Sequence, residues 1–371
     1  MHRCLKIPEL IHMICRCLFE LSALATLAAL ARVHKDFENP ALDALWAEQS
    51  TLINLVRCMP PDICRNAMRN RACGPVLSRD LDRLLKYSAR IRIYKMYEPS
   101  KNSVGGGAWK SGELFRILHS AVPQASLFPN LKTLQWAEWF PDETSRRWIP
   151  FFLGEKLTNI TLHVTPSDQV LTLLSRIRTH CPLIQDASLD FESLSSLLPV
   201  QVEESIIRSC VSYAAAVSGW SRLSHLSVST MDATAWLHLS RAGTLKVSNI
   251  LRLQDADGRT LQSGLEPYPK GFSSLCELRV HRASLDACGQ LIKRFARSPI
   301  ETLVIIVEFS SSNHSWPTFL ERIFASRVEK NTYIRCFPDA HTWTTNPQSH
   351  NETSFIFPQS HGHLDPVPFQ H

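Results

Sequence analysis

A glycine-rich stretch, VGGGAWKSGELFRIL at residues 104–118, is the first candidate for chemistry in this sequence. It holds Lys110 beside Ser111 and is expected between a strand and a helix, as in loops that wrap nucleotide phosphates. In such loops glycine directly precedes the lysine, so that backbone N–H groups can approach the β-phosphate. Trp109 occupies that place here. The stretch is therefore interpreted as a loop of the fold and not as a nucleotide site.

Cysteine and histidine residues do not form a recognisable metal or nucleophile motif. The eleven cysteines are irregularly spaced, and the closest pair, Cys15 and Cys17, lacks a second pair that would complete a zinc site. The HGH at 361–363 supplies too few ligands, and no G-x-S-x-G elbow marks a serine hydrolase. We therefore expect no cofactor, no metal and no enzymatic activity. Four cysteines inside apolar patterns are read as small buried side chains of a protein from a reducing compartment: Cys15, Cys210, Cys276 and Cys288.

Composition and charge limit the class of protein further. The 371 residues are 44% hydrophobic and 20% charged, which is enough apolar material for a large core. The net charge of +6 is spread along the chain without a Lys/Arg cluster, so nucleic acid is not an expected partner. The apolar run at 21–31 is too short to span a bilayer, and charged residues interrupt the segment before it. We expect no membrane segment and a cytoplasmic or nuclear location.

The first fifty residues predict three short helices. Pro8 suits the first turn of a helix, and a second helix is expected over 22–33. The third is expected to begin at Asn39 as the N-cap, with Pro40 in the first helical position. So small a helical unit has a weak core and usually needs a partner or a neighbouring domain. The first helix carries one apolar stripe at helical spacing: Ile7, Leu10, Ile11, Ile14 and Leu18.

These residues resemble the F-box, in the variety common in mushroom-forming fungi. The resemblance rests on the opening IPEL at 7–10, the small-residue second helix running into ALARVHKDF, and the closing PALDALW, and it covers roughly residues 3–48. It implies docking onto the Skp-family adaptor of a cullin–RING ubiquitin ligase. Phe37 stands where many F-boxes have tryptophan. By position, ten residues match the core and adaptor-facing sites of that family: Ile7, Pro8, Leu10, Ile11, Ile14, Leu18, Leu30, Val33, Phe37 and Trp46.

An alternative interpretation of the same stripe remains open. Apolar residues at helical spacing usually pack inside a protein, and the three helices could simply cap the domain that follows them. In that case Ile7, Pro8 and Leu10 would be buried against residues 50–100. If they are exposed, the docking interpretation is favoured.

A repeat with an irregular sequence pattern occupies most of the remaining chain. Segments of the form apolar-x-x-apolar-x-apolar recur and resemble the strands of leucine-rich repeats, whose alternate side chains point into a solenoid. The asparagine or cysteine that follows such strands in standard repeats is missing, so an irregular array is expected over 87–337. The segments are IRIYKM (91–96), LKTLQW (131–136), LTNITL (157–162), IQDASL (184–189), LSHLSV (223–228), LCELRV (275–280), IETLVI (300–305) and, as a poorer match, SNILRL (248–253).

Helices are expected between these strands, the clearest at 165–182, where Thr165 and Pro166 begin it and Pro182 ends it. The predicted organisation is therefore α/β: an F-box-like three-helix domain (1–49), a helical bridge (50–86), the irregular solenoid (87–337) and a mostly disordered tail (338–371). The resemblance implies a substrate receptor of an SCF-type ubiquitin ligase with an unknown protein substrate. A repeat scaffold capped by the three helices is the alternative. The varied polar residues between the apolar positions of the strands could bind a partner or simply face solvent.

Overall fold

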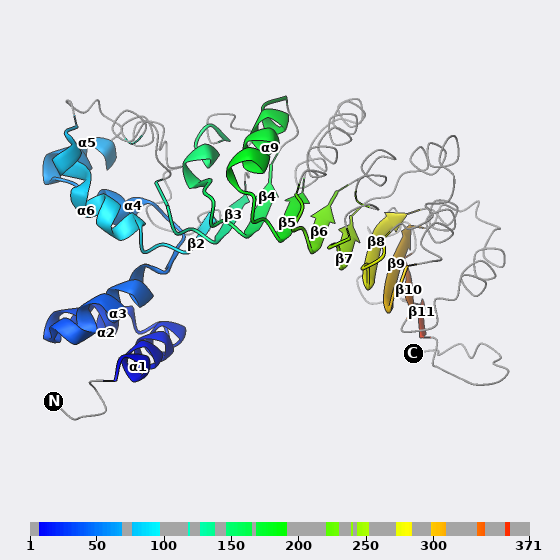
Figure 1. Ribbon diagram of the computed structural model, residues 1–371, viewed down its shortest axis with the longest axis horizontal. Helices are drawn as coiled ribbons and strands as arrows, with labels where there is room; N and C mark the ends of the chain where they lie inside the picture. Colours follow the sequence, from blue (N-terminus) through cyan, green and yellow to red (C-terminus); the bar gives the residue numbers. More distant parts are fainter. Residues whose placement is uncertain are drawn as a thin grey trace, which may run out of the picture. The chain divides into compact units, whose positions relative to one another are not determined.

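The computed structural model describes residues 7–68, 76–96, 118, 127–137, 146–164, 168–190, 220–229, 239, 243–251, 272–283, 298–308, 332–337 and 353–356. These form a mixed α/β protein with a parallel sheet, as expected (Figure 1). The chain divides into two compact units. The amino-terminal unit comprises Met1–Leu162 with Thr179–Leu183, and the carboxy-terminal unit comprises His163–Arg178 with Ile184–His371.

The amino-terminal unit begins with helices and continues with strands. The helices α1 to α3 confirm the predicted succession of three short helices within the first fifty residues. Strand β1 pairs in parallel with β2, and β2 pairs in parallel with β3. The elements are α1 (Pro8–Glu20), α2 (Leu24–Val33), α3 (Lys35–Trp46), β1 (Glu48–Gln49), α4 (Ile53–Val56), α5 (Pro61–Met68), α6 (Ser78–Ser88), β2 (Ile93–Met96), β3 (Thr133–Ala137), the 3-10 helix η2 (Ile149–Phe152) and β4 (Asn159–His163).

The helix starts divide into one confirmed and one wrong prediction. Pro8 is the first residue of α1, where its missing N–H leaves no hydrogen bond unmade. The third helix, however, begins four residues before the predicted cap, at Lys35. His34 is its N-cap, and His34 Nδ1 accepts a hydrogen bond of 3.2 Å from the backbone N–H of Asp36. Pro40 therefore lies inside α3, so the Asn39–Pro40 pair does not mark its beginning.

The carboxy-terminal unit is built mainly on strands that follow each other in chain order (Figure 1). Pairing is parallel from β5 to β10, and only the last described pair, β10 with β11, is antiparallel. Strand β11 lies within the segment predicted to be mostly disordered, and the sequence analysis did not anticipate it. The elements are α9 (Asp168–His180, ending in the other unit), β5 (Asp186–Asp190), β6 (His225–Val228), β7 (Val247–Ile250), β8 (Glu277–Ala283), β9 (Thr302–Glu308), β10 (Thr332–Phe337) and β11 (Thr353–Ile356).

One backbone arrangement recurs where successive strands begin. The carbonyl oxygen just before β1, that of Ala47, accepts hydrogen bonds from two consecutive N–H groups at the start of β2, those of Arg92 and Ile93. The same pattern, in which one carbonyl oxygen accepts from two consecutive N–H groups, joins β2 to β3 and β3 to β4. In the other unit it joins each neighbouring pair from β5 to β9, and all these N···O distances are 2.7–3.0 Å. Equivalent geometry at each step is what a chain of repeated coils produces. The other accepting carbonyls belong to Arg92, Lys132, Gln185, Ser224, Lys246 and Cys276.

The predicted strand segments match the observed strands except at one place. SNILRL was expected to begin a coil at Ser248, but β7 spans Val247–Ile250 and Leu245 takes the first buried position. Ser248 pairs in register with Leu226 of β6 and Leu278 of β8, both buried. The prediction chose the wrong register because it required an apolar residue at a position that this coil fills with serine.

Side chains alternate along the strands as the repeat pattern predicts. In β3 to β5, buried side chains alternate with partly exposed ones, so one face of each strand contributes to a core and the other does not. The predicted helix over 165–182 is present as α9, with residues 165–167 outside the described part of the chain. The apolar face of α9 is buried: Val170, Leu173, Leu174 and Ile177.

Several predictions fall on residues that the structure does not describe. These are the glycine-rich stretch except Leu118, nearly all of the tail, and the cysteines at 210 and 288. Among the described residues, no helix combines the length and apolar character that crossing a bilayer requires.

Candidate functional site: an exposed apolar surface on the amino-terminal helices

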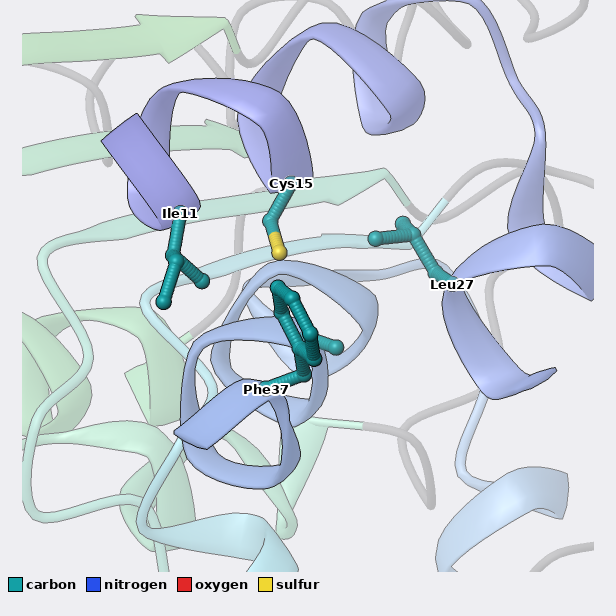
Figure 2. Packing of buried hydrophobic residues seen from close by; sticks show 5 residues of the cluster. Ile11, Cys15, Leu27 and Phe37 are labelled. Atoms are coloured by element: carbon teal, nitrogen blue, oxygen red, sulfur yellow. The ribbon is translucent and has the colours of Figure 1, made fainter. Parts of the chain in front are cut away.

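Helices α1, α2 and α3 enclose a small core of their own (Figure 2). Ile11 and Cys15 point from α1 toward Phe37 of α3, and Leu27 of α2 approaches from the side. The cluster consists of Ile11, Cys15, Leu27, Phe37 and Ala41, none more than 6% exposed, with partly buried side chains around it. Burial in this core raises the pKa of the Cys15 thiol. The described core of the three helices is therefore complete without residues from elsewhere in the chain.

A second set of apolar side chains on the same helices is not buried. Ile7, Ile14 and Leu21 are spaced seven residues apart, so they lie on one side of α1 and its C-cap, next to the side that faces the core. Large exposed apolar side chains that gather on a small unit are typical of binding surfaces, which makes these helices the first candidate site. We call the following set the apolar surface: Ile7 (44% exposed), Met13 (54%), Ile14 (39%), Leu21 (77%), Leu24 (47%) and Val33 (71%).

The ten residues predicted to bind an adaptor separate into groups in the structure. Ile7, Pro8, Ile14 and Val33 are exposed. Ile11 and Phe37 are buried in the core of the helices and are not accessible to a partner. Leu10, Leu18, Leu30 and Trp46 are partly buried, and Leu18 and Leu30 pack against the core cluster.

Trp46 contacts another helix and is not part of the apolar surface. Its ring stacks on that of Tyr87 in α6, with centroids 4.7 Å apart and planes at 16°. Trp46 ends α3 one residue before the carbonyl of Ala47, which begins the repeated backbone pattern. Its structural role is thus to join α3 to the strand-bearing part of the unit.

Three members of the apolar surface were missed by sequence reasoning. Met13 lies off the predicted stripe, while Leu21 and Leu24 flank the turn between α1 and α2. Ser22 in that turn has a left-handed backbone conformation with a φ of 57°. It lies between Leu21, the C-cap of α1, and Leu24, the first residue of α2. The available signal was the apolar run at 21–31, which was considered only as a possible membrane segment and as part of the second helix.

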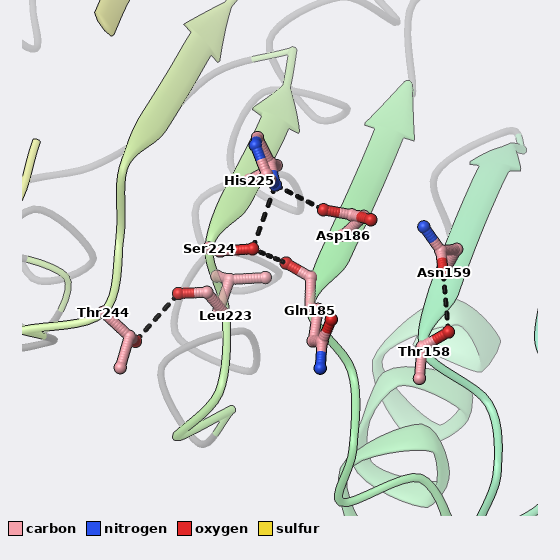
Figure 3. Close-up of polar contacts among 8 residues, drawn as sticks. All are labelled: Thr158, Asn159, Gln185, Asp186, Leu223, Ser224, His225 and Thr244. Carbon is pink, nitrogen blue, oxygen red and sulfur yellow. Dashed lines mark hydrogen bonds and ion pairs between the residues drawn. The ribbon is translucent and has the colours of Figure 1, made fainter. Parts of the chain in front are cut away.

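A polar surface on the strands of the carboxy-terminal unit is the second candidate site. His225 of β6 lies opposite Asp186 of β5, and His225 Nδ1 is 2.5 Å from Asp186 Oδ1 and 2.9 Å from Ser224 Oγ (Figure 3). At the other end of β5, His163 Nδ1 is 3.1 Å from Asp190 Oδ2, and Ser229 Oγ donates to Asp190 Oδ1 at 3.3 Å. These polar side chains pair across neighbouring strands, and all of them are at least partly exposed except Ser229, which is buried.

The Ser224–His225–Asp186 group does not have the geometry of a hydrolytic triad. In a triad one imidazole nitrogen faces the serine while the other faces the carboxylate, so that a proton can pass through the ring. Here both Ser224 Oγ and Asp186 Oδ1 lie against the same nitrogen, Nδ1. The hydroxyl also donates to the carbonyl oxygen of Gln185 at 3.2 Å. The arrangement ties β6 to β5 and does not activate a nucleophile.

A metal centre is likewise not present among the described residues, where no three His, Cys, Asp or Glu side chains converge. Burial raises the pKa of the Cys181 thiol to about 11, with a smaller opposing effect from a hydrogen bond to the backbone of Gly154. Such a thiol stays protonated at neutral pH and is a poor nucleophile.

Comparison with known proteins adds no relative to this description. No family model matches the chain. No curated protein sequence matches it either.

Proposed function

We propose that this protein is a substrate-recognition subunit of an SCF-type ubiquitin ligase. In this proposal α1–α3 are an F-box that docks onto a Skp-family adaptor, and the strand coils form an irregular leucine-rich-repeat solenoid that holds a protein substrate. The protein itself carries out no chemistry and acts by keeping the substrate near the charged conjugating enzyme, which raises its effective concentration there.

The observation that carries the proposal is the exposure of the apolar surface. Ile7 and Pro8 are exposed and Leu10 is only partly buried. The core beneath them is formed by α1–α3 alone in the described part of the chain. Capping of residues 50–100 by this end of α1 would have buried them. Covering the exposed parts of these apolar side chains would favour binding in proportion to the apolar area removed from water.

One observation supports the alternative, in which α1–α3 only cap a repeat scaffold. Trp46 at the end of α3 stacks on Tyr87 of α6, and this contact supports a capping role for the carboxyl end of α3. The two functions predict different effects of a charge placed in the apolar surface. Under capping the substitution would destabilise the strands, whereas under docking it would remove only the partner.

The test is a charged substitution in α1. Ile14→Glu should weaken binding of a purified Skp-family adaptor by about 2 kcal/mol or more, roughly thirty-fold in Kd, because the carboxylate would be desolvated at the interface. His12→Glu, on an exposed part of α1 away from Ile14, is the matched control and should bind as the native chain does. Circular dichroism and thermal melting should show both variants folded. Adaptor affinity unchanged in Ile14→Glu and in Ile7→Glu, or no adaptor binding by the native chain, would refute the docking role.

A further inference from the structure

Arg90 makes an unusual set of contacts between the turn after α6 and the side of α3. Its guanidinium Nη2 donates to Asn39 Oδ1 at 2.8 Å, and Nη1 contacts Asn39 O at 3.4 Å and forms an ion pair with Asp43 Oδ1. Asn39 and Asp43 are four residues apart, so they lie on one face of α3. A single side chain thereby holds α3 at two points one turn apart.

The backbone that carries Arg90 is itself fixed. Its N–H donates to Tyr87 O at 3.0 Å, and the N–H of Ile91 donates to Ser88 O at 3.1 Å. Ile91 is fully buried and leads directly into β2. The guanidinium therefore extends from a turn whose backbone is fixed next to β2, so it holds a defined position relative to the first strands.

The covalent link between the helices and the sheet is short, and its sheet end is held by the hydrogen bonds that Ala47 O accepts from Arg92 and Ile93. Only Ala47 separates the end of α3 from the start of β1. Residues at element ends are where hinge motions concentrate, because a change in φ and ψ there rotates a whole segment. The Trp46–Tyr87 stack lies next to Ala47 and resists rotation close to the pivot. Arg90 acts farther out along α3 and so has the longer lever arm.

The contacts of Arg90 are expected to set the orientation of α3 more than to raise the free energy of unfolding. Its side chain is 14% exposed, and its Nε has no hydrogen-bond partner among the described residues. Removing an arginine from water and leaving one donor unmade offsets much of what the ion pair contributes, and apolar replacements of such pairs are often neutral or stabilising. What an apolar residue could not reproduce is the bidentate fit to two fixed acceptors.

We propose that Arg90, with Asn39 and Asp43, is a positioning residue that fixes the direction of α1–α3 relative to β1–β3. A partner docked on the apolar surface is then held at one orientation to the first strands. The functional consequence rests on the proposed function, since it matters only if that surface carries a partner. The orientation itself does not depend on it.

The test is a distance measurement across the Ala47 junction. Spin labels on genetically encoded amino acids at Arg16 of α1 and Lys132, just before β3, would report the distribution of distances in the full chain by pulsed electron paramagnetic resonance. Both sites are exposed, and this labelling avoids the native cysteines. The native chain should give one narrow distribution, and Arg90→Met should give a broader one. Arg92→Met, the same chemical change at an exposed neighbour, is the control and should leave the distribution narrow.

The outcomes separate positioning from stability and from adaptor binding. A broad distribution in the native chain, or one in Arg90→Met as narrow as the native, would overturn the proposal whatever happens to the melting temperature. If Arg90→Met does not fold, Asp43→Ala and Asn39→Ala each remove one side-chain acceptor of Arg90 and should broaden the distribution. Adaptor affinity should be unchanged in Arg90→Met, because Arg90 lies outside the apolar surface. Failure of the native chain to bind an adaptor would refute the docking function while leaving the distance result intact.

Discussion

Ser248 is a single residue in which the repeat departs from its own pattern. It occupies a fully buried position in β7 between leucines of the adjacent strands, and its hydroxyl has no hydrogen-bond partner among the described residues. A buried polar group without a partner costs about 1–3 kcal/mol. Ser248→Ala should therefore raise the free energy of unfolding of this unit by about 1 kcal/mol, since it removes the hydroxyl and little volume.

Ser227→Ala is the matched control for that measurement. Ser227 lies on the neighbouring strand with its side chain on the other face, and its Oγ accepts a hydrogen bond of 3.2 Å from Asn249 Nδ2. Removing that acceptor should lower stability or leave it unchanged in urea denaturation. A loss of stability in Ser248→Ala comparable to that in Ser227→Ala would show that the buried hydroxyl has a partner after all.

Single residues of α1 also show why residue types alone do not predict which side chains form a site. A helical stripe identifies which residues are apolar, but not which edge of the stripe faces the core. Ile11 and Ile14 are three residues apart and chemically identical, yet one is 3% exposed and the other 39%. The difference depends on where α3 crosses α1, which is a tertiary fact that one sequence does not contain. Hence the stripe was predictable, and its division into core and surface was not.

Helix α3 is the element whose prediction failed most clearly, and the reason is physical. Asn followed by Pro is a strong local signal for a helix start, because proline lacks the N–H that a first turn leaves unused. In the structure the helix continues back to Lys35, and Phe37 in this added turn is buried against α1 and α2. Burial of an aromatic side chain outweighs the one backbone hydrogen bond that Pro40 cannot make.

This reading of α3 predicts the effect of replacing its proline. Pro40→Ala restores an N–H that can donate to the carbonyl four residues earlier in an existing helix, so the free energy of unfolding should rise by about 1 kcal/mol or more. Pro8→Ala is the control, since Pro8 is the first residue of α1 and its N–H would gain no such bond. If α3 instead began at Pro40, both substitutions would behave alike in thermal melts of the full chain.

At the scale of the whole molecule, the parallel sheet and its chain-order topology follow from sequence features that repeat. The predicted strand segments were recognised by three apolar positions. Their predicted register was wrong only at β7, where Ser248 replaces one of the apolar residues. Strands β1, β10 and β11 were missed. The first has two residues, and its one buried position holds Gln49, whose amide nitrogen donates to Leu45 O at 3.3 Å. A polar residue with a local partner satisfies the fold without carrying the apolar signal.

The division into two compact units predicts that damage to one core stays local. If the strands belong to the repeat solenoid that we propose, each coil contacts mainly its neighbours and stability is a sum of local terms. Leu134 of β3 and Leu226 of β6 are both fully buried, one in each unit. Either change to alanine should cost about 2–5 kcal/mol through the cavity it leaves. Hydrogen exchange followed by mass spectrometry should show faster exchange over β2–β4 in Leu134→Ala and over β5–β8 in Leu226→Ala. Thr133→Ala, one residue from Leu134 and only partly buried, should change neither region. If either leucine substitution accelerates exchange equally in both regions, the chain unfolds as one cooperative body and the two units are not energetically separate.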